Sequence, residues 1–122
     1  MGVWCRSLDR RHVFDALWNR RVYGTTGPRI LLRFAIDGSP MGSEATLRQG
    51  ATAQIQTASD VPITRIDLVK DGDDFRSEPV STREVRCQME IAPDDGAASY
   101  YVRVTREDGE MAWSSPIWVN QA

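Results

Sequence analysis

The sequence predicts an all-β fold: an immunoglobulin-like antiparallel β-sandwich preceded by one amphipathic α-helix. Apolar residues recur at helical spacing near the N-terminus, and from residue 28 onward they alternate with polar residues to the end of the 122-residue chain. Turn signals, most of them Asp-Gly, separate roughly six or seven alternating segments, a spacing typical of a sandwich. We therefore divide the chain into a helix and corner at 1–27 and a β-sandwich domain at 28–122.

The helix is expected from Asp9 to Arg21, with Asp9 as its N-terminal cap and Gly24 as the left-handed residue that stops it. Arg20 and Arg21 suit the negative end of its dipole. An isolated helix of this length is marginal in water, so its apolar stripe must be buried, either on the sandwich or on a partner. The stripe, which we interpret as the helix docking face, consists of Val13, Phe14, Leu17 and Trp18.

The strands near the C-terminus show the clearest alternation of apolar and polar residues. Tyr100 and Trp113 share the phase of the core aliphatic residues, so we expect both in the core. Tyr101 and Trp118 take the opposite phase, where they either cover the helix or form a platform on which sugars stack. The last two strands should form a hairpin about 108–109, and Pro116, which lacks an N–H group, predicts an edge or a bulge in the final strand.

Composition and length indicate one soluble domain with a core of its own. The chain is 41% hydrophobic, yet its apolar runs are only a few residues long, so we expect no membrane-spanning segment and no membrane partner. The first residues also lack the apolar stretch of a secretory signal, and the cellular compartment stays open. Two cysteines are too few for a disulfide scaffold, and the phase of Cys87 predicts a buried free thiol.

Charge is distributed unevenly along the chain. Seven arginines and two aspartates occur up to Arg33, a local charge of +5, and since the whole chain carries -2, the remainder carries -7. A basic helix suits either phosphate groups or an acidic neighbouring domain. Because no nucleic-acid motif and no interleaved exposed aromatic residues accompany the arginines, we expect no nucleic-acid partner.

The sequence contains no complete catalytic or metal-binding set. His12 is the only histidine, whereas a catalytic zinc or two-metal centre needs several converging ligands. The acidic run 71–74 lacks the ligand spacing of a calcium-binding hand, and Ser114 and Ser115 have neither a nearby histidine nor nucleophile-elbow glycines. We therefore predict no catalytic residue, no metal site and no cofactor in this chain.

The Gly-rich corner at 24–27 offers hydroxyl groups that can contact an anion. Phosphate cradles form at helix N-termini, however, and this corner follows a helix, so we favour a structural role in which the hydroxyls satisfy backbone groups. Thr25, Thr26 and Arg29 stay candidates for a ligand or domain contact, together with Tyr101 and Trp118.

Several segments in order along the chain resemble the C-terminal end of metal-dependent hydrolases of the PHP (polymerase and histidinol phosphatase) superfamily. They include Arg-Arg-Val-Tyr-Gly-Thr-Thr-Gly-Pro-Arg-Ile at 20–30 and Ala-Trp-Ser-Ser-Pro-Ile-Trp-Val at 112–119, with shorter matches at 2–4, 14–17 and 38–44. The most similar branch comprises largely uncharacterised bacterial proteins related to carbaryl-hydrolase-like enzymes.

The resemblance implies a non-catalytic accessory domain that packs on a catalytic barrel. The metal ligands of that superfamily lie in an upstream barrel, in motifs such as His-x-His and Asp-x-His that are absent here. The expected partner is thus the upstream, divalent-metal-binding hydrolase domain of the same parent chain, with a weak homodimer as a second association. One alternative is a stand-alone carbohydrate- or peptide-binding module that uses the outward aromatic residues. A phosphoesterase active in its own right is the least favoured, because the ligands are missing.

Overall fold

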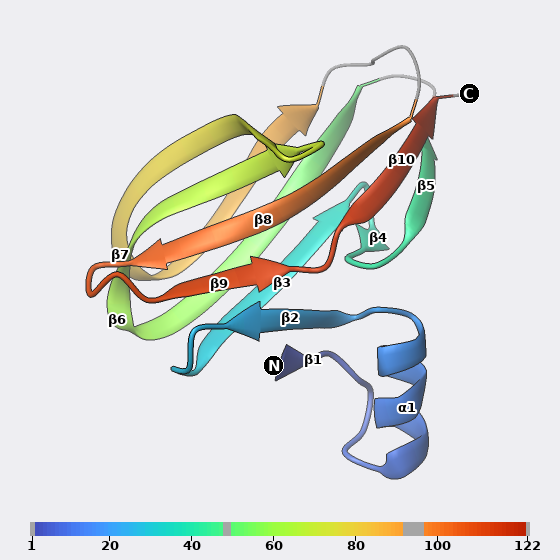
Figure 1. The fold of residues 1–122 in the computed structure, drawn as a ribbon, viewed down its shortest axis with the longest axis horizontal. Coiled ribbons are helices and arrows are strands. Elements are labelled where there is room, and N and C mark those ends of the chain that lie inside the picture. The colour runs from blue at the N-terminus through green and yellow to red at the C-terminus, as the bar shows by residue number, and fades with distance from the viewer. Residues whose placement is uncertain (1, 48–49, 92–96, 122) are drawn as a thin grey trace.

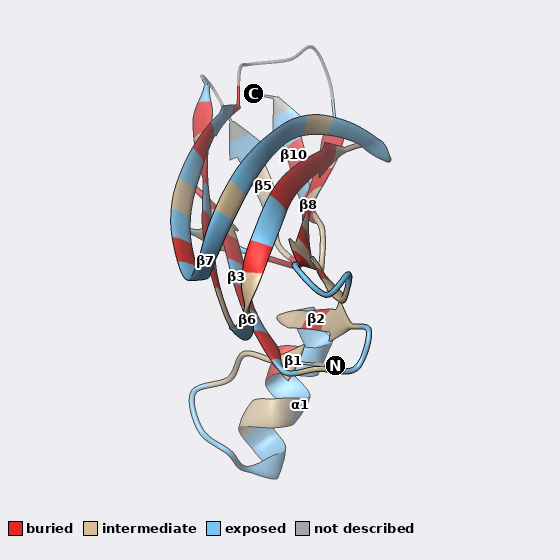
Figure 2. Ribbon diagram, turned by 90° about the vertical axis from the view of Figure 1, so that its left-hand side faces the viewer, coloured by how far each residue is buried: buried red, intermediate tan, exposed pale blue. Residues whose placement is uncertain are grey.

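The computed structural model, which describes residues 2–47, 50–91 and 97–121, consists mostly of antiparallel strands with one helix (Figure 1). This confirms the all-β prediction. Viewed from the side, the sheet curls until its two halves face each other as in a sandwich (Figure 2). The elements are β1 (Gly2–Val3), α1 (Arg10–Trp18), β2 (Val22–Thr25), β3 (Ile30–Ile36), β4 (Ser39–Pro40), β5 (Glu44–Leu47), β6 (Ala51–Lys70), β7 (Asp73–Ile91), β8 (Ala98–Arg106), β9 (Met111–Ser114) and β10 (Ile117–Gln121).

The long hairpin of β6 and β7 belongs to both halves of the sandwich. On its other edge, β6 pairs first with β3, from Ala53 to Ser59, and then with β8, from Ile63 to Lys70. The register of the β6–β7 ladder shifts between Ala58 and Ile63, and this irregular stretch contains a proline that cannot donate to the ladder. The sequence pattern suggested separate short strands here, because the alternation breaks at this bend.

Arg106 stabilises the bend in β6 through hydrogen bonds and ion pairs. Its side chain is only 5% exposed, and its Nη1 atom lies 3.2 Å from Ser59 Oγ and 3.1 Å from Asp60 Oδ1. It also pairs with Asp108 in the following turn. The guanidinium thereby joins the end of β8 to the point where β6 passes from one half of the sandwich to the other.

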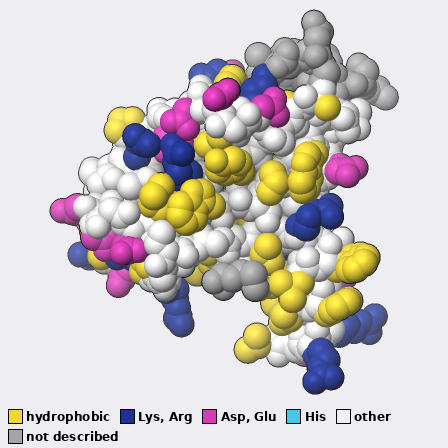
Figure 3. Space-filling view, in the orientation of Figure 1, with side chains coloured by type: hydrophobic (Ala, Val, Ile, Leu, Met, Phe, Trp, Pro, Cys, Tyr) yellow, Lys and Arg dark blue, Asp and Glu magenta, His cyan; other side chains and the backbone are white. Residues whose placement is uncertain are grey.

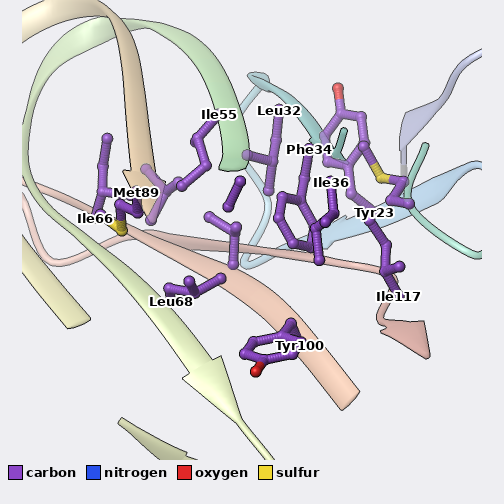
Figure 4. Close-up of a cluster of buried hydrophobic side chains, with 14 of the residues drawn as sticks. Tyr23, Leu32, Phe34, Ile36, Ile55, Ile66, Leu68, Met89, Tyr100 and Ile117 are labelled. Carbon is purple, nitrogen blue, oxygen red and sulfur yellow. The ribbon is translucent and has the colours of Figure 1, made fainter. Parts of the chain in front are cut away.

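The core lies between the two halves, where the inward residues of the long strands meet (Figure 4). Strand β8 shows the predicted alternation, with every second residue buried from Ala98 to Arg106. Phe34 of β3 and Tyr100 of β8 are among the largest fully buried side chains. Burial of such apolar area is the main favourable contribution to folding.

The predicted register of β9 is wrong. Ala112 and Ser114 are the buried residues of this strand, whereas Trp113 is only half-buried on the other face. Ser114 Oγ accepts a hydrogen bond of 2.9 Å from the N–H of Val102, which satisfies the buried hydroxyl. The alternation of buried and exposed residues changes phase between β9 and β10. Trp118 therefore points outward, as predicted, whereas Trp113 does not point inward as expected.

The final strand is not an edge. Strand β10 lies between β5, to which it runs parallel, and β8, to which it runs antiparallel. Pro116 precedes β10 rather than interrupting it, and its carbonyl accepts a hydrogen bond of 2.8 Å from the N–H of Gly42. The missing N–H therefore costs the ladder nothing.

Three Asp-Gly turns join strands as the sequence indicates. Asp37-Gly38 and Asp71-Gly72 have positive φ at both residues, which is the geometry of tight hairpins between β3 and β4 and between β6 and β7. Gly109, at φ 86°, lies in the confirmed hairpin of β8 and β9. The predicted turns at 49–50 and 94–96 fall wholly or partly outside the described residues.

The helix begins where predicted and ends earlier. Asp9 caps it by accepting a hydrogen bond of 2.9 Å from the N–H of His12. The C-terminal cap is Asn19, followed by Arg20 in the left-handed region at φ 59°, so the end expected at Arg21 is wrong. Gly24 is not the helix stop, since it lies within β2, which pairs with β9. The segment 1–27 thus contributes two strands to the sheet as well as the helix.

The exposed apolar face of the helix as a candidate docking surface

One face of α1 exposes large apolar side chains. Phe14 is 64% exposed, Leu17 43% and Trp18 72%, while Val13 is half-buried. The rings of Phe14 and Trp18 stack with their centroids 6.4 Å apart. In the space-filling view, hydrophobic side chains gather over the helix (Figure 3). We call Phe14, Leu17 and Trp18 the helix face; it coincides with most of the docking face predicted from the sequence, and the sandwich does not cover it.

A close backbone contact holds the helix in place. Ala16, on the opposite side, is fully buried, and the N–H of Arg21 donates to its carbonyl over 2.9 Å. Arg20 Nε donates to the carbonyl of Gly42 over 2.8 Å. Gly42 has φ 90°, and a Cβ atom there would lie 2.4 Å from the carbonyl oxygen of Arg20. Only glycine permits this approach, so the end of α1 is anchored on the sandwich while its helix face points away.

Basic side chains flank the helix face. Arg10 and Arg11 are exposed in the first turn. Arg21 pairs with Asp15 over 2.9 Å, and His12 Nδ1 lies 2.8 Å from Asp9 Oδ2. The hydrogen bonds from the backbone and the ring of His12 lower the pKa of the Asp9 carboxyl. The surface therefore combines an apolar centre with a cationic margin, which suits an acidic margin on a partner.

The hydroxyls of the corner satisfy backbone groups, as the favoured interpretation required. Thr26 Oγ1 accepts from the N–H of Met111 over 3.0 Å and donates to the carboxylate of Glu110. Thr25 Oγ1 accepts from the N–H of Gly27 over 3.2 Å. A shallow groove brings Thr25 together with the exposed Arg29. It does not include Tyr101 or Trp118, so the predicted contact residues fall into two groups.

Tyr101 and Trp118 lie on the outer face of neighbouring strands. Trp118 of β10 pairs with Ser99 of β8, and Tyr101 lies two residues after Ser99 on β8. The two aromatic residues are therefore diagonal neighbours. Trp118 is 37% exposed, and the guanidinium of Arg20 sits 5.1 Å from its ring centroid. Since Arg20 occupies one face of the indole, that face is closed to a stacking sugar.

A buried carboxylate organises the outer face of β6 and β8. Asp67 is fully buried, and its oxygens accept from Ser77 Oγ at 2.6 Å, Arg65 Nε at 3.0 Å and Arg103 Nε at 3.1 Å. Arg103 also pairs with Asp74 over 3.0 Å. Although burial acts to raise it, these hydrogen bonds together lower the pKa of the Asp67 carboxyl. Both carboxylate oxygens accept from side chains of the fold, so we assign Asp67 a structural role.

Among residues 2–47, 50–91 and 97–121, no three His, Cys, Asp or Glu side chains come together in a way that could hold a metal ion. Within the same residues, α1 is the one helix, and it is too short to cross a membrane. His12 contacts Asp9 on the surface of the helix. The predicted absence of a catalytic residue, a metal site and a cofactor stays a prediction.

The arrangement defines a small sandwich-like β-domain that carries an exposed apolar helix. A family model described as "Protein of unknown function (DUF3604)" matches residues 1–74, which include α1 and all strands through β6. Uncharacterised proteins of Chlamydia muridarum and Chlamydia trachomatis are each 34% identical to this chain over 137 residues, and one of Chlamydia pneumoniae is 31% identical over 140. Each alignment covers 98% of this chain.

The chain belongs to the DUF3604 family. It spans only 22% of the length of these three relatives. Most of each relative therefore has no counterpart in the residues described here.

Proposed function

We propose that this chain is a non-catalytic accessory domain that packs, through α1, on the catalytic barrel of a metal-dependent hydrolase. The observation that supports this proposal is the helix face of Phe14, Leu17 and Trp18, which the domain's own sandwich leaves exposed. A stand-alone module would be expected to bury such a stripe on itself.

The energetics favour an occupant for this surface. Two aromatic residues and a leucine exposed to this degree present on the order of 350 Å² of apolar area. Burial of that area would contribute about 9 kcal/mol before the costs of association are subtracted. Because the helix is held through Gly42, docking requires little reorganisation of the backbone.

The proposed occupant is a further domain of a longer parent chain. The relatives are several times longer than this chain, so in them the counterpart of the helix face can meet another domain of the same polypeptide. The cationic margin of Arg10 and Arg11 suits an apolar groove with acidic residues at its rim. The finer assignment of the fold as immunoglobulin-like belongs to the same proposal and rests on the two facing halves that share the β6–β7 hairpin.

The first test is the genomic sequence upstream of the codon for Met1. An open reading frame that encodes His-x-His and Asp-x-His motifs would support the proposal, whereas an in-frame stop codon immediately upstream would contradict it. Where the frame continues, the upstream domain, produced as a separate protein, should bind this chain in an isothermal titration. Trp18→Ser should abolish that binding. Leu31→Ser is the matched control, because Leu31 is 46% exposed but lies on β3, away from the helix face.

The isolated chain provides a second test. Gly42 holds only the end of α1, and the body of this short helix is uncovered, so its backbone amides should exchange with solvent faster than those of the core strands. Light scattering should show association that increases with protein concentration. Phe14→Ser should reduce this association, and Leu31→Ser should leave it unchanged. Slow amide exchange in a strict monomer would argue against a docking helix.

A further inference from the structure

The outer face of β3, β6 and β7 contains an open groove, on the opposite half of the sandwich from the Asp67 network. Its volume is about 740 Å³. The side chains that matter for its chemistry are two arginines, three glutamines and one alanine: Arg33, Ala35, Gln54, Gln56, Arg86 and Gln88.

Strand register arranges these side chains in two rows across the sheet. Arg33 pairs with Gln56, which pairs with Arg86 on the other side. In the next row Ala35 pairs with Gln54, which pairs in turn with Gln88. Adjacent strands lie about 4.8 Å apart, so the Cα atoms of the two arginines are roughly 10 Å apart with an amide between them.

Both guanidinium groups are available to a ligand. Arg33 and Arg86 are exposed, and within the described parts of the chain neither forms an ion pair with a carboxylate. Arg33 is oriented by Trp4, whose ring centroid lies 4.8 Å from the guanidinium carbon. Trp4 is itself fixed, since its Nε1 donates to the carbonyl of Leu32 over 2.6 Å. Arg33, at one end of the row, is thus held in position without a ligand.

We propose that this groove binds an acidic oligosaccharide, with Arg33 and Arg86 holding carboxylates and the glutamines holding hydroxyls. Guanidinium groups match carboxylates through paired N–H donors. Each glutamine amide has both donor and acceptor atoms, and a sugar hydroxyl likewise donates and accepts. Ala35, the smallest side chain in the two rows, leaves room for a sugar ring to approach the sheet.

The site favours a saccharide over the other anionic polymers. A peptide that binds a sheet typically pairs with the backbone of an edge strand, whereas this groove lies on a face and presents side chains. Single-stranded nucleic acid needs aromatic rings free to stack with bases. The two rows contain none, and the adjacent ring of Trp4 is occupied by the guanidinium of Arg33. The groove is separate in sequence and in strands from the helix face, so this binding does not depend on the proposed docking function.

Titration of the full chain with trigalacturonate at low ionic strength tests the proposal. We expect saturable binding, no binding of the neutral sugar maltotriose, and a dissociation constant raised about tenfold or more by Arg33→Gln combined with Arg86→Gln. The control combines Arg6→Gln with Arg83→Gln, two exposed arginines outside the groove that produce the same change in net charge, and it should alter affinity less than twofold.

A second readout keeps the test independent of variant folding. In NMR spectra of the unmodified chain, the side-chain amide signals of Gln54, Gln56 and Gln88 should shift on addition of trigalacturonate. Absence of binding, equal losses in both double variants, or equal affinity for maltotriose would overturn the proposal. So would tighter binding of a triglutamate peptide, because the groove would then recognise acidic peptides. Substitution of Trp18 in the helix face should leave the titration unchanged, so the two proposals fail separately.

Discussion

Replacement of Asp67 by alanine tests whether the buried carboxylate holds β6, β7 and β8 together. Its carboxylate receives hydrogen bonds from three side chains on these strands, and it has no contact with solvent. Alanine would leave Arg103 and Ser77 without this acceptor. Asp74→Ala is the matched control, since Asp74 pairs with the same arginine but its side chain is 53% exposed.

The expected loss follows from the burial of the partners. Removal of one member of a buried ion pair costs about 3 to 5 kcal/mol, whereas an exposed pair contributes about 1 kcal/mol or less. Arg65 is half exposed and Arg103 retains Asp74, so we expect a value near the lower end. Asp67→Ala should therefore lower the free energy of unfolding by about 3 kcal/mol, and Asp74→Ala by less than about 1 kcal/mol.

The effect of Asp67 should also depend on pH. The pKa of its carboxyl is lower in the folded than in the unfolded state, because the hydrogen bonds from Ser77, Arg103 and Arg65 outweigh the opposing effect of burial. Its stabilisation is thus complete above the unfolded pKa of about 3.9 and is lost as the pH falls through the folded value. The difference in unfolding free energy between the native chain and Asp67→Asn should shrink as the pH falls below about 4.

Urea denaturation of these variants at pH 7 and at acidic pH provides the measurement. A loss for Asp67→Ala no larger than that for Asp74→Ala would show that the network contributes little. A difference between the native chain and Asp67→Asn that stays constant down to pH 3 would refute the assignment of a lowered pKa.

Two further predictions concern the core and the thiol of Cys87, which was expected to be buried but is only partly buried against the core. Tyr100→Ala should lower the free energy of unfolding by about 3 to 5 kcal/mol, because Tyr100 is 1% exposed. Trp113→Ala should lower it by clearly less, because Trp113 is only half-buried. Equal losses in urea denaturation would contradict the register of β9. In a Cys5→Ser variant, Cys87 should react slowly with iodoacetamide at pH 8, since burial, with the nearby Glu78 carboxylate, raises its pKa to about 11 and leaves roughly one thiol in a thousand ionised. Alkylation at the rate of free cysteine would rule this out.

The strongest local patterns predicted the structure well. Alternation placed Tyr100 in the core and Trp118 outside, and Asp9 was identified as the helix cap. Prediction from the sequence failed where contacts with distant segments of the chain determine the local structure. The end of the helix is fixed by the left-handed conformation of Arg20 against Gly42, a contact between segments twenty-two residues apart.

The other differences have three separate causes: a shift of phase, a polar strand and long-range strand register. Trp113 was expected in the core because it shares the phase of Ile117 and Val119, but the phase shifts between β9 and β10, so Ala112 and Ser114 face inward instead. The beginning of β7 was missed because its residues from Asp73 to Glu78 are polar or exposed on almost every position. The groove of Arg33 and Arg86 could not be predicted either, since it exists only in the register that joins β3, β6 and β7.

The pairing of β2 with β9 has a consequence for synthesis on the ribosome. Strand β2 ends at Thr25, whereas its neighbour β9 begins at Met111, so the two can pair only after nearly the whole chain has been made. Until then β1 and β2 lack their place in the sheet, and Gly42, which anchors the end of α1, lacks its hydrogen bond to the carbonyl of Pro116. Closure of so long a segment is slow, and apolar surface exposed meanwhile is prone to aggregation. The nascent helix should thus be a target for chaperones, and a domain already folded ahead of it would be the surface it meets first.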